Sequence, residues 1–418
     1  MKLFPDHWKT DSVSALCTDV VDCVNKTAPT IDGPTEYKMI RTTNVKAGRI
    51  NLDDCKYVDE ATFVKWTRRI QPKRNDIVLT REAPLGEVGL LRSDESVFLG
   101  QRTMLYRANP KKLDQRFLYY SMLGPLVQGQ IRSQGSGATV EHLRVPDAES
   151  FLVAYPPLDE QRRIAALLSA YDDLIANNQR RIALLESMAE EIYREWFVRM
   201  RFPGHESQLD AQAEWRLEPL ESLGTFMNGY PFDPSEWFDE GLPIVKIKEL
   251  NSGVGSDTPR NPGDKIPAKY HFGDGDLLFS WSGSLVVQIW HQGSALVNQH
   301  LFKVTPAAGV SRSFLYLSIK FSIPIFESLT TGATMQHIKR KELRFVKVRI
   351  PPEALMKQFV SAVDPLLENA LSLKKQTRRL REMRDALLPR LISGKLRVDQ
   401  LDIQFPPSMR VETAEAAP

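Results

Sequence analysis

Apolar side chains recur in residues 156–202 at alternating spacings of four and three. This heptad rhythm, with Arg, Glu and Gln elsewhere around the helix, is typical of a long helix that packs along one narrow seam. Pro156-Pro157 precedes the run, and Pro203-Gly204 ends it. Because so narrow a seam cannot be buried by its own helix, the pattern predicts a partner helix. The seam consists of Ile164, Leu168, Tyr171, Ile175, Asn178, Ile182, Leu185, Ala189, Ile192 and Trp196.

A second seam with the same rhythm lies in residues 351–394, again directly after a Pro-Pro pair. It consists of Phe359, Val363, Leu366, Ala370, Leu373, Thr377 and Leu380. Asn178 and Thr377 are polar members of the two seams, and one polar residue in such a seam tends to fix its register at some cost in stability. A loosely packed, hydrated midpoint is the alternative interpretation.

The repetition extends upstream of both helices. The segment GATVEH at 137–142 returns as GATMQH at 332–337, and Pro156 returns as Pro351, both 195 positions later. Other matches occur in the same order at steadily larger offsets, as loop insertions and deletions would produce: Phe117–Tyr119 with Phe314–Tyr316, Asp76–Thr80 with Asp276–Ser280, and Ile40-Arg41 with Val245-Lys246. The chain is therefore interpreted as two copies of a globular unit, each followed by a long helix. Since each helix would leave one domain and run toward the other, we expect the helices to be antiparallel.

Each globular unit mixes short strand-like and helix-like segments. Asp76–Thr80 and Glu87–Leu91 have β-type composition, whereas Lys112–Leu123 has a helical apolar face that ends at Gly124-Pro125. This mixture predicts the α+β class. The expected divisions are domain 1 at 1–157, a central helix at 158–202, a linker at 203–214, domain 2 at 215–350, a distal helix at 351–396 and a C-terminal tail at 397–418, frayed from 403 onward.

Bulk composition narrows the function classes only slightly. The chain has 418 residues and a net charge of +3, which permits nucleic-acid binding without arguing for it. No apolar run approaches the eighteen or so residues of a membrane span, and the first residues lack an apolar signal core, so we expect a cytoplasmic protein. The three cysteines lack CxxC spacing, and the histidines lack metal-ligand spacing.

The sequence lacks the common motifs for catalysis. No GxxxxGK[ST] phosphate loop and no strand-borne GxGxxG are present. Tyr155-Pro156-Pro157-Leu158 reverses the order that an amino-methyltransferase motif requires, and Glu36-Tyr37-Lys38 lacks the upstream aspartate of a metal-dependent nuclease. We therefore expect a non-catalytic chain that itself binds neither metal nor cofactor.

Binding chemistry is better represented than catalysis. Arginine and lysine suit guanine edges or phosphates, and asparagine and glutamine suit adenine. Candidates in the first copy are Arg41, Thr42, Thr43, Asn44, Lys46, Gln101 and Arg102, and in the second Lys246, Lys248, Asn251 and Gln299, beside His300. A solvated strand face, or a structural hydrogen bond for the glutamines, is the alternative for any one of them.

The repeated Gly-Ala-Thr-x-x-His segments supply four more candidates, Thr139, His142, Thr334 and His337. Because both copies share this segment, a structural or phosphate-positioning role is favoured over direct base contact. Trp281 lies in a loop rich in Gly and Ser, where it could wedge into DNA or belong to the core.

In combination, GAT-x-x-H, then PP-L-x-EQ-x-x-I-A, then REWFVRxRFPGHE resembles the specificity subunits of type I restriction-modification systems. The resemblance implies two tandem target-recognition domains separated by two long antiparallel coiled-coil helices, related by a pseudo-two-fold internal repeat. It also implies that residues 1–12 pack beside the C-terminal helix. The implied partners are double-stranded DNA, two modification subunits that use S-adenosylmethionine, and restriction subunits that use ATP and Mg.

Two functions from different classes follow. In the first, the chain reads DNA without catalysis, its two diverged domains each recognising one half of a bipartite asymmetric site while the helices set the gap and dock the modification subunits. In the second, it is a protein-interaction scaffold on a coiled-coil spine that does not bind DNA. Salt-sensitive, sequence-specific DNA retention would distinguish them.

Overall fold

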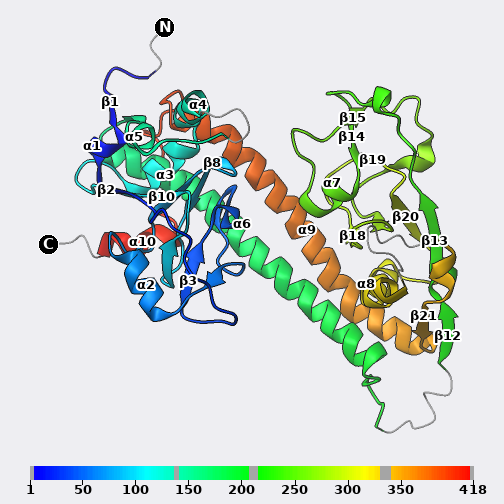
Figure 1. Ribbon diagram of the computed structural model, residues 1–418. Helices are drawn as coiled ribbons and strands as arrows, with labels where there is room; N and C mark the ends of the chain where they lie inside the picture. The colour runs from blue at the N-terminus through cyan, green and yellow to red at the C-terminus, as the bar shows by residue number, and fades with distance from the viewer. Residues whose placement is uncertain (1–3, 136–140, 207–214, 330–339, 415–418) are drawn as a thin grey trace. The chain divides into compact units, whose positions relative to one another are not determined.

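The computed structural model describes residues 4–135, 141–206, 215–329 and 340–414. The chain forms two compact units: unit 1 comprises Met1–Leu174 with Leu380–Pro418, and unit 2 comprises Ile175–Arg379. Both contain small sheets and short helices, and each takes part of the two long helices α6 (Leu158–Tyr193) and α9 (Glu353–Leu391) (Figure 1). The predicted mixed class with an internal repeat and two long helices is confirmed.

Unit 1 is built around a six-stranded sheet. Its order is β2 (Cys17–Asp22), β10 (Thr103–Ala108), β7 (Ile77–Arg81), β8 (Leu85–Leu90), β5 (Gly48–Ile50) and β4 (Val45–Lys46). A three-stranded sheet has the order β6 (Lys56–Tyr57), β3 (Tyr37–Ile40) and β9 (Ser96–Leu99), and β1 (Lys9–Ser12) pairs with β11 (Leu152–Tyr155). The helices are α1 (Val13–Leu16), α2 (Glu60–Thr67), α3 (Gln115–Leu123), α4 (Pro125–Gln134), α5 (Val145–Glu149) and α10 (Pro407–Ala414).

Unit 2 repeats this plan with fewer strands. Its first sheet has the order β13 (Gly224–Asn228), β20 (Leu301–Pro306), β17 (Leu277–Ser280) and β18 (Val287–Ile289). Its second has the order β15 (Arg260–Asn261), β14 (Leu242–Val245), β19 (Ala295–Val297) and β16 (His271–Phe272), and β12 (Arg216–Pro219) pairs with β21 (Lys347–Ile350). Helices α7 (Ile247–Ser252) and α8 (Arg312–Leu329) complete the unit.

The central strand of each unit is buried on both faces. In β7, Ile77 and Leu79 join the core beneath α3 and α4, whereas Val78 points to a second core on the other face. In β17, Leu277 and Phe279 likewise face one core and Leu278 faces another. Alternate side chains of a strand point to opposite faces, so a continuous apolar run suits a strand covered on both sides.

The long helices pack in antiparallel fashion within unit 2. Glu186 of α6 pairs with Lys374 of α9 at 2.6 Å, and beyond the end of α6 Phe197 contacts Phe359, near the start of α9, with ring centroids 4.8 Å apart. A π-helical turn, Arg194–Val198, ends the first helix. In unit 1, Asp172 of α6 pairs with Arg384 of α9 at 2.6 Å.

Burial along the helix seams differs in places from the strict heptad. Ile164, Leu168, Ile175, Asn178, Ile182, Phe359, Val363, Leu373 and Thr377 are buried, whereas Tyr171, Leu185, Leu366 and Leu380 are only partly buried. Asp172 and Leu367, each one position later than a seam residue, are buried instead. A straight α-helix drifts against a seven-residue repeat, and both helices also cover the cores of the units.

The expected fraying after residue 403 is wrong for the residues described there. The α10 segment packs onto unit 1, where Met409 is 3% exposed and Ser408 accepts a hydrogen bond from the buried Arg116. An apolar side chain and a polar anchor together hold this short helix. At the other terminus, Trp8 shares a core with Leu391 of the distal helix, as the resemblance implied.

Candidate nucleic-acid interface

A tight turn follows strand β3 in unit 1 and carries five of the candidates. The backbone N–H of Arg41 donates to Asn44 Oδ1 at 2.9 Å, and Asn44 Nδ2 donates to the Asp54 carbonyl at 3.0 Å. Asn44 is 1% exposed, so its amide holds the turn and does not face a ligand. The Arg41 guanidinium donates to the same Asp54 carbonyl at 2.6 Å. Thr43 and Lys46 are exposed.

In the equivalent turn of unit 2, a side chain again accepts a hydrogen bond from the backbone N–H three residues earlier, but the residue types differ. The backbone N–H of Lys246 donates to the buried Glu249 carboxylate at 3.0 Å and starts α7. Lys246 Nζ lies 4.2 Å from the ring centroid of Trp237, which is 42% exposed. Lys248 pairs with Asp257, and the hydrogen bond from Lys248 lowers the pKa of that carboxyl. Asn251 is exposed at the end of α7.

The tip of the β7–β8 hairpin gathers candidates that are far apart in the sequence. The Glu82 carboxylate lies 3.3 Å from Arg102 Nε and 3.4 Å from His142 Nδ1. Thr42 Oγ1 donates to the carbonyl of the neighbouring Ala83 at 2.8 Å. Gln101 precedes Arg102 in the chain, and its side-chain oxygen accepts a hydrogen bond from Thr27 Oγ1 at 3.1 Å. Acidic, cationic and hydroxyl groups from four segments of the chain therefore meet at this tip.

The β17–β18 hairpin tip of unit 2 forms the corresponding junction. The Trp281 indole N–H donates to the Gln299 carbonyl at 3.1 Å, and its ring lies 5.6 Å from the His300 ring. Ser282 Oγ and His300 Nδ1 are 3.3 Å apart. Trp281 is partly buried, and Gln299 is exposed. The structure thus brings Trp281 and Gln299 together, while Thr139, Thr334 and His337 lie outside the described residues.

Both junctions offer donors and acceptors that suit base edges and phosphate oxygens. Within the described ranges, no group of three or more His, Cys, Asp or Glu side chains could hold a metal ion. In that same part of the chain, no helix is long and apolar enough to cross a membrane.

The sequence matches one family model twice. Residues 17–187 and 213–380 each match the model described as "Type I restriction modification DNA specificity domain". The chain belongs to this family. Each matched segment begins in a globular unit and runs into one of the long helices, so the family's domain is the repeated element that the sequence pattern predicted.

Relatives in the family are distant but cover most of the chain. The type I restriction enzyme MjaIX specificity subunit of Methanocaldococcus jannaschii is 27% identical over 367 residues, with 82% of each protein covered. The EcoKI specificity subunit of Escherichia coli K12 is 23% identical, with 94% of this chain and 90% of that protein covered. The crystal structure of the Type-I restriction-modification system S subunit from M. genitalium shares the fold, with a TM-score of 0.58, 19% identity and coverage of 94% and 98%. The chain is accordingly a specificity subunit with a DNA-recognition role.

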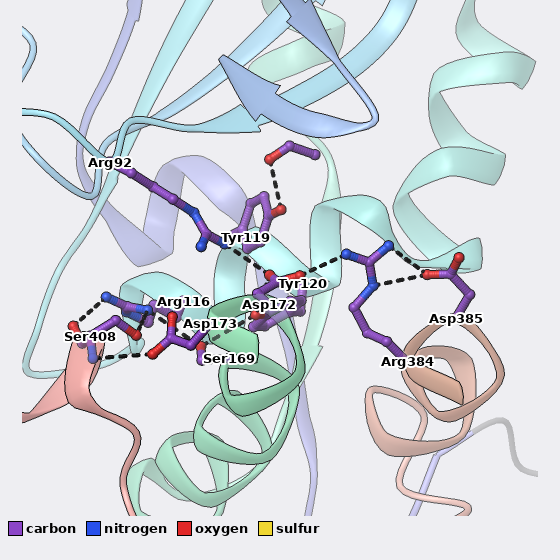
Figure 2. A network of polar contacts seen from close by, with 11 residues as sticks. Arg92, Arg116, Tyr119, Tyr120, Ser169, Asp172, Asp173, Arg384, Asp385 and Ser408 are labelled. Carbon is purple, nitrogen blue, oxygen red and sulfur yellow. Dashed lines mark hydrogen bonds and ion pairs between the residues drawn. The ribbon is translucent and has the colours of Figure 1, made fainter. Parts of the chain in front are cut away.

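Sequence reasoning missed a buried polar network that joins the unit 1 sheet to the long helices. The Asp172 carboxylate accepts hydrogen bonds from Tyr120 at 2.8 Å, Arg92 at 2.9 Å and Arg384 at 2.6 Å (Figure 2). Burial alone would raise the pKa of Asp172, but Arg92 and Arg384 outweigh burial and hold this pKa below its ordinary value. A seam pattern that counts only apolar side chains gives no signal for such a residue.

Two further residues of the interface were missed. Glu82 is replaced by Ser282 at the corresponding position of unit 2, so no repeated acidic residue marked it. Trp237, beneath Lys246, has no aligned aromatic partner in the first copy. The signal available for Trp237 was the run Glu236-Trp237-Phe238, in which two large aromatic side chains stand beside acidic residues.

Proposed function

We propose that each unit reads one half of a bipartite, asymmetric DNA site and that the chain itself catalyses no reaction. The observation that carries the proposal is that both units share the same backbone features but present different side chains on them. The same capped turn and hairpin tip present Glu82 with Arg102 in unit 1 but Ser282 with His300 in unit 2. Two similar surfaces with different donors and acceptors suit two different base sequences.

The cofactors of the reaction belong to partner subunits in this proposal. Two modification subunits would methylate adenine with S-adenosylmethionine, and restriction subunits would use ATP and Mg. The long helices would dock the modification subunits in the cytoplasm. Leu184 and Met188 of α6, 65% and 53% exposed, support a protein-docking role for this helix because they lie one turn apart.

Exchange of the first domain tests the two-reader proposal. Residues 16–155 would be replaced by the first domain of another family member, and the methylated motif would be read by methylation-sensitive sequencing in a host that also expresses the modification subunit. One half-site should change while the other stays. As the matched control, exchange of residues 216–350 should change only the other half-site.

Three outcomes would contradict the proposal. If one exchange changed both half-sites together, the units would not read independently. If the purified assembly showed no preference for its own sequence over a scrambled duplex, the scaffold interpretation would replace DNA reading. Methyl transfer by the purified chain alone, given S-adenosylmethionine and DNA, would contradict its non-catalytic role.

A further inference from the structure

Four arginines of unit 1 surround the Asp172 network. Arg92, two residues beyond β8, and Arg384 of α9 bind opposite oxygens of the Asp172 carboxylate (Figure 2). Arg49 lies in β5, which pairs with β8 so that Arg49 is opposite Leu90. Arg381 precedes Arg384 by three residues and so lies one helical turn away on the same face. The sheet edge and the distal helix thus each place a further arginine near the two that bind Asp172.

Positive charge exceeds negative charge at this place. The charges that act most strongly on the four guanidiniums are one another's and those of two carboxylates, Asp172 and Asp385. Partial burial and the charge of Arg92 lower the pKa of Arg49, and loss of solvent around its inner end and the charge of Arg384 lower that of Arg381. The Arg384 guanidinium donates hydrogen bonds to the carboxylates of Asp172 and Asp385. Arg92 Nε, by contrast, is a buried atom that meets no hydrogen-bond partner among the residues that the structure describes.

The second copy has a histidine at the position that corresponds to Arg92. His291 follows β18 by two residues, as Arg92 follows β8. Burial and the charges of Lys374 and Arg378 lower the pKa of His291 to about 4, against the opposing charge of Asp274. Cationic side chains of α9 therefore lie near the end of the hairpin strand in both copies, and in the second copy Lys374 is paired with Glu186.

We propose that Arg49, Arg92 and Arg381 form a phosphodiester-binding site that holds the DNA backbone independently of its sequence, with Arg384 as a positioning residue. Clustered guanidiniums bind phosphate oxygens through paired N–H donors, and they are less strongly hydrated than ammonium groups. The Asp172 carboxylate fixes two of them while leaving a net positive charge for the ligand. The inference rests on the proposed DNA-reading function and adds a contact outside the base-reading loops.

Salt dependence of DNA binding tests the site. The chain would be purified with its modification subunits. Fluorescence anisotropy would measure its affinity for a duplex that carries the recognised sequence and for a scrambled duplex, at salt concentrations between about 50 and 300 mM. The double variant R49A/R381A should weaken both complexes by the same factor. The slope of log K against log salt should become shallower by about 0.9 for each arginine. The ratio of the two affinities should not change.

Controls separate the site from general charge and from folding. Arg144→Ala and Arg397→Ala remove exposed arginines of unit 1 that already pair with Asp147 and Asp399, so they should leave the slope unchanged. Arg381→Gln changes an exposed helix position and provides a folded variant if the double substitution lowers the thermal midpoint.

Distinct outcomes would overturn the inference. An unchanged slope in a folded variant would exclude a phosphate contact, and weaker binding of the recognised duplex alone would indicate base reading instead. If the variant no longer bound the modification subunits while the slope of log K against log salt stayed unchanged, the arginines would belong to a contact between proteins. If the wild-type assembly did not prefer its own sequence, the proposed function would fail, whereas the slope comparison would still test the site.

Discussion

At the scale of single residues, Asp172 carries the largest expected effect on stability. Its carboxylate is 2% exposed and accepts hydrogen bonds from Tyr120, Arg92 and Arg384. Asp172→Asn would leave Arg92 without its counter-charge and Arg384 with only the exposed Asp385, which should lower the free energy of unfolding by about 3–5 kcal/mol. Denaturant unfolding measures this loss. Asp399→Asn removes an exposed partner of Arg397 and should change nothing measurable. Equal stabilities would show that the network does not hold the unit.

The lowered pKa of Asp172 leads to a prediction of how the stability of the chain depends on pH. In the folded chain the pKa of Asp172 lies below its ordinary value, which is about 3.9 in an unfolded chain. Between these two values the unfolded chain binds a proton that the folded chain does not bind, so stability falls as pH falls. The wild-type advantage over Asp172→Asn should therefore be full above about pH 5 and shrink in acid. Unfolding free energies from pH 7 to pH 3 test this, and a constant difference would contradict it.

At the scale of elements, the polar position in the distal helix offers a stabilising substitution. Thr377 is 4% exposed, and its hydroxyl finds no hydrogen-bond partner among the described residues. Thr377→Val keeps the shape of the side chain and removes the unsatisfied group, so the free energy of unfolding should rise by roughly 1 kcal/mol. Thr67→Val is the matched control, because the Thr67 hydroxyl donates to the Phe63 carbonyl at 2.8 Å. A loss of stability in Thr377→Val would mean that the hydroxyl is satisfied in solution.

The C-terminal helix α10 is expected to behave as part of unit 1. Ending the chain after Asp402 would remove Met409 from the core and expose the guanidinium of Arg116, which is 5% exposed in the full chain. Burial of one apolar side chain is worth about 1.5–3 kcal/mol, so the thermal midpoint should fall. Ending the chain after Ala414 is the matched control and should leave the midpoint unchanged. Identical midpoints for both truncations would show that α10 does not stabilise the unit.

Elements governed by apolar periodicity could be predicted, and elements governed by polar contacts could not. The runs at Asp76–Thr80 and Glu87–Leu91 correspond to β7 and β8, because side chains buried on a strand leave a continuous apolar signature. Helix α10 is short and polar, and its place depends on Arg116, which lies 292 positions away. Among the candidate site residues, Asn44 also makes polar contacts that its residue type does not reveal. Its residue type suits adenine, but its amide is used within the turn.

At the scale of the whole molecule, neither unit is a continuous segment of the chain. Unit 1 takes the start of α6 and the end of α9, and unit 2 takes the rest of both helices. Each helix therefore passes from one unit into the other. In the proposed function this connectivity would set the gap between the half-sites, because the path between the units consists of hydrogen-bonded helix and not of flexible linker.

Lengthening both helices tests whether they set that gap. One heptad would be inserted after Leu174 in α6 and one after Arg379 in α9, at the boundaries between the units. Seven residues add about 10.5 Å and nearly complete two turns, so the seams keep their facing. Since DNA rises about 3.4 Å per base pair, the gap should lengthen by roughly three base pairs while both half-sites stay unchanged.

The methylated motif of each variant, read with its modification subunit, measures the gap. Inserting two residues at the same places is the control, because about 200° of rotation would turn part of each seam away from its partner and should abolish assembly. A folded, active heptad variant with an unchanged gap would exclude the helices as the spacer. In that case the proposed function would have to assign the gap to another part of the assembly, and the helices would serve only to join the units.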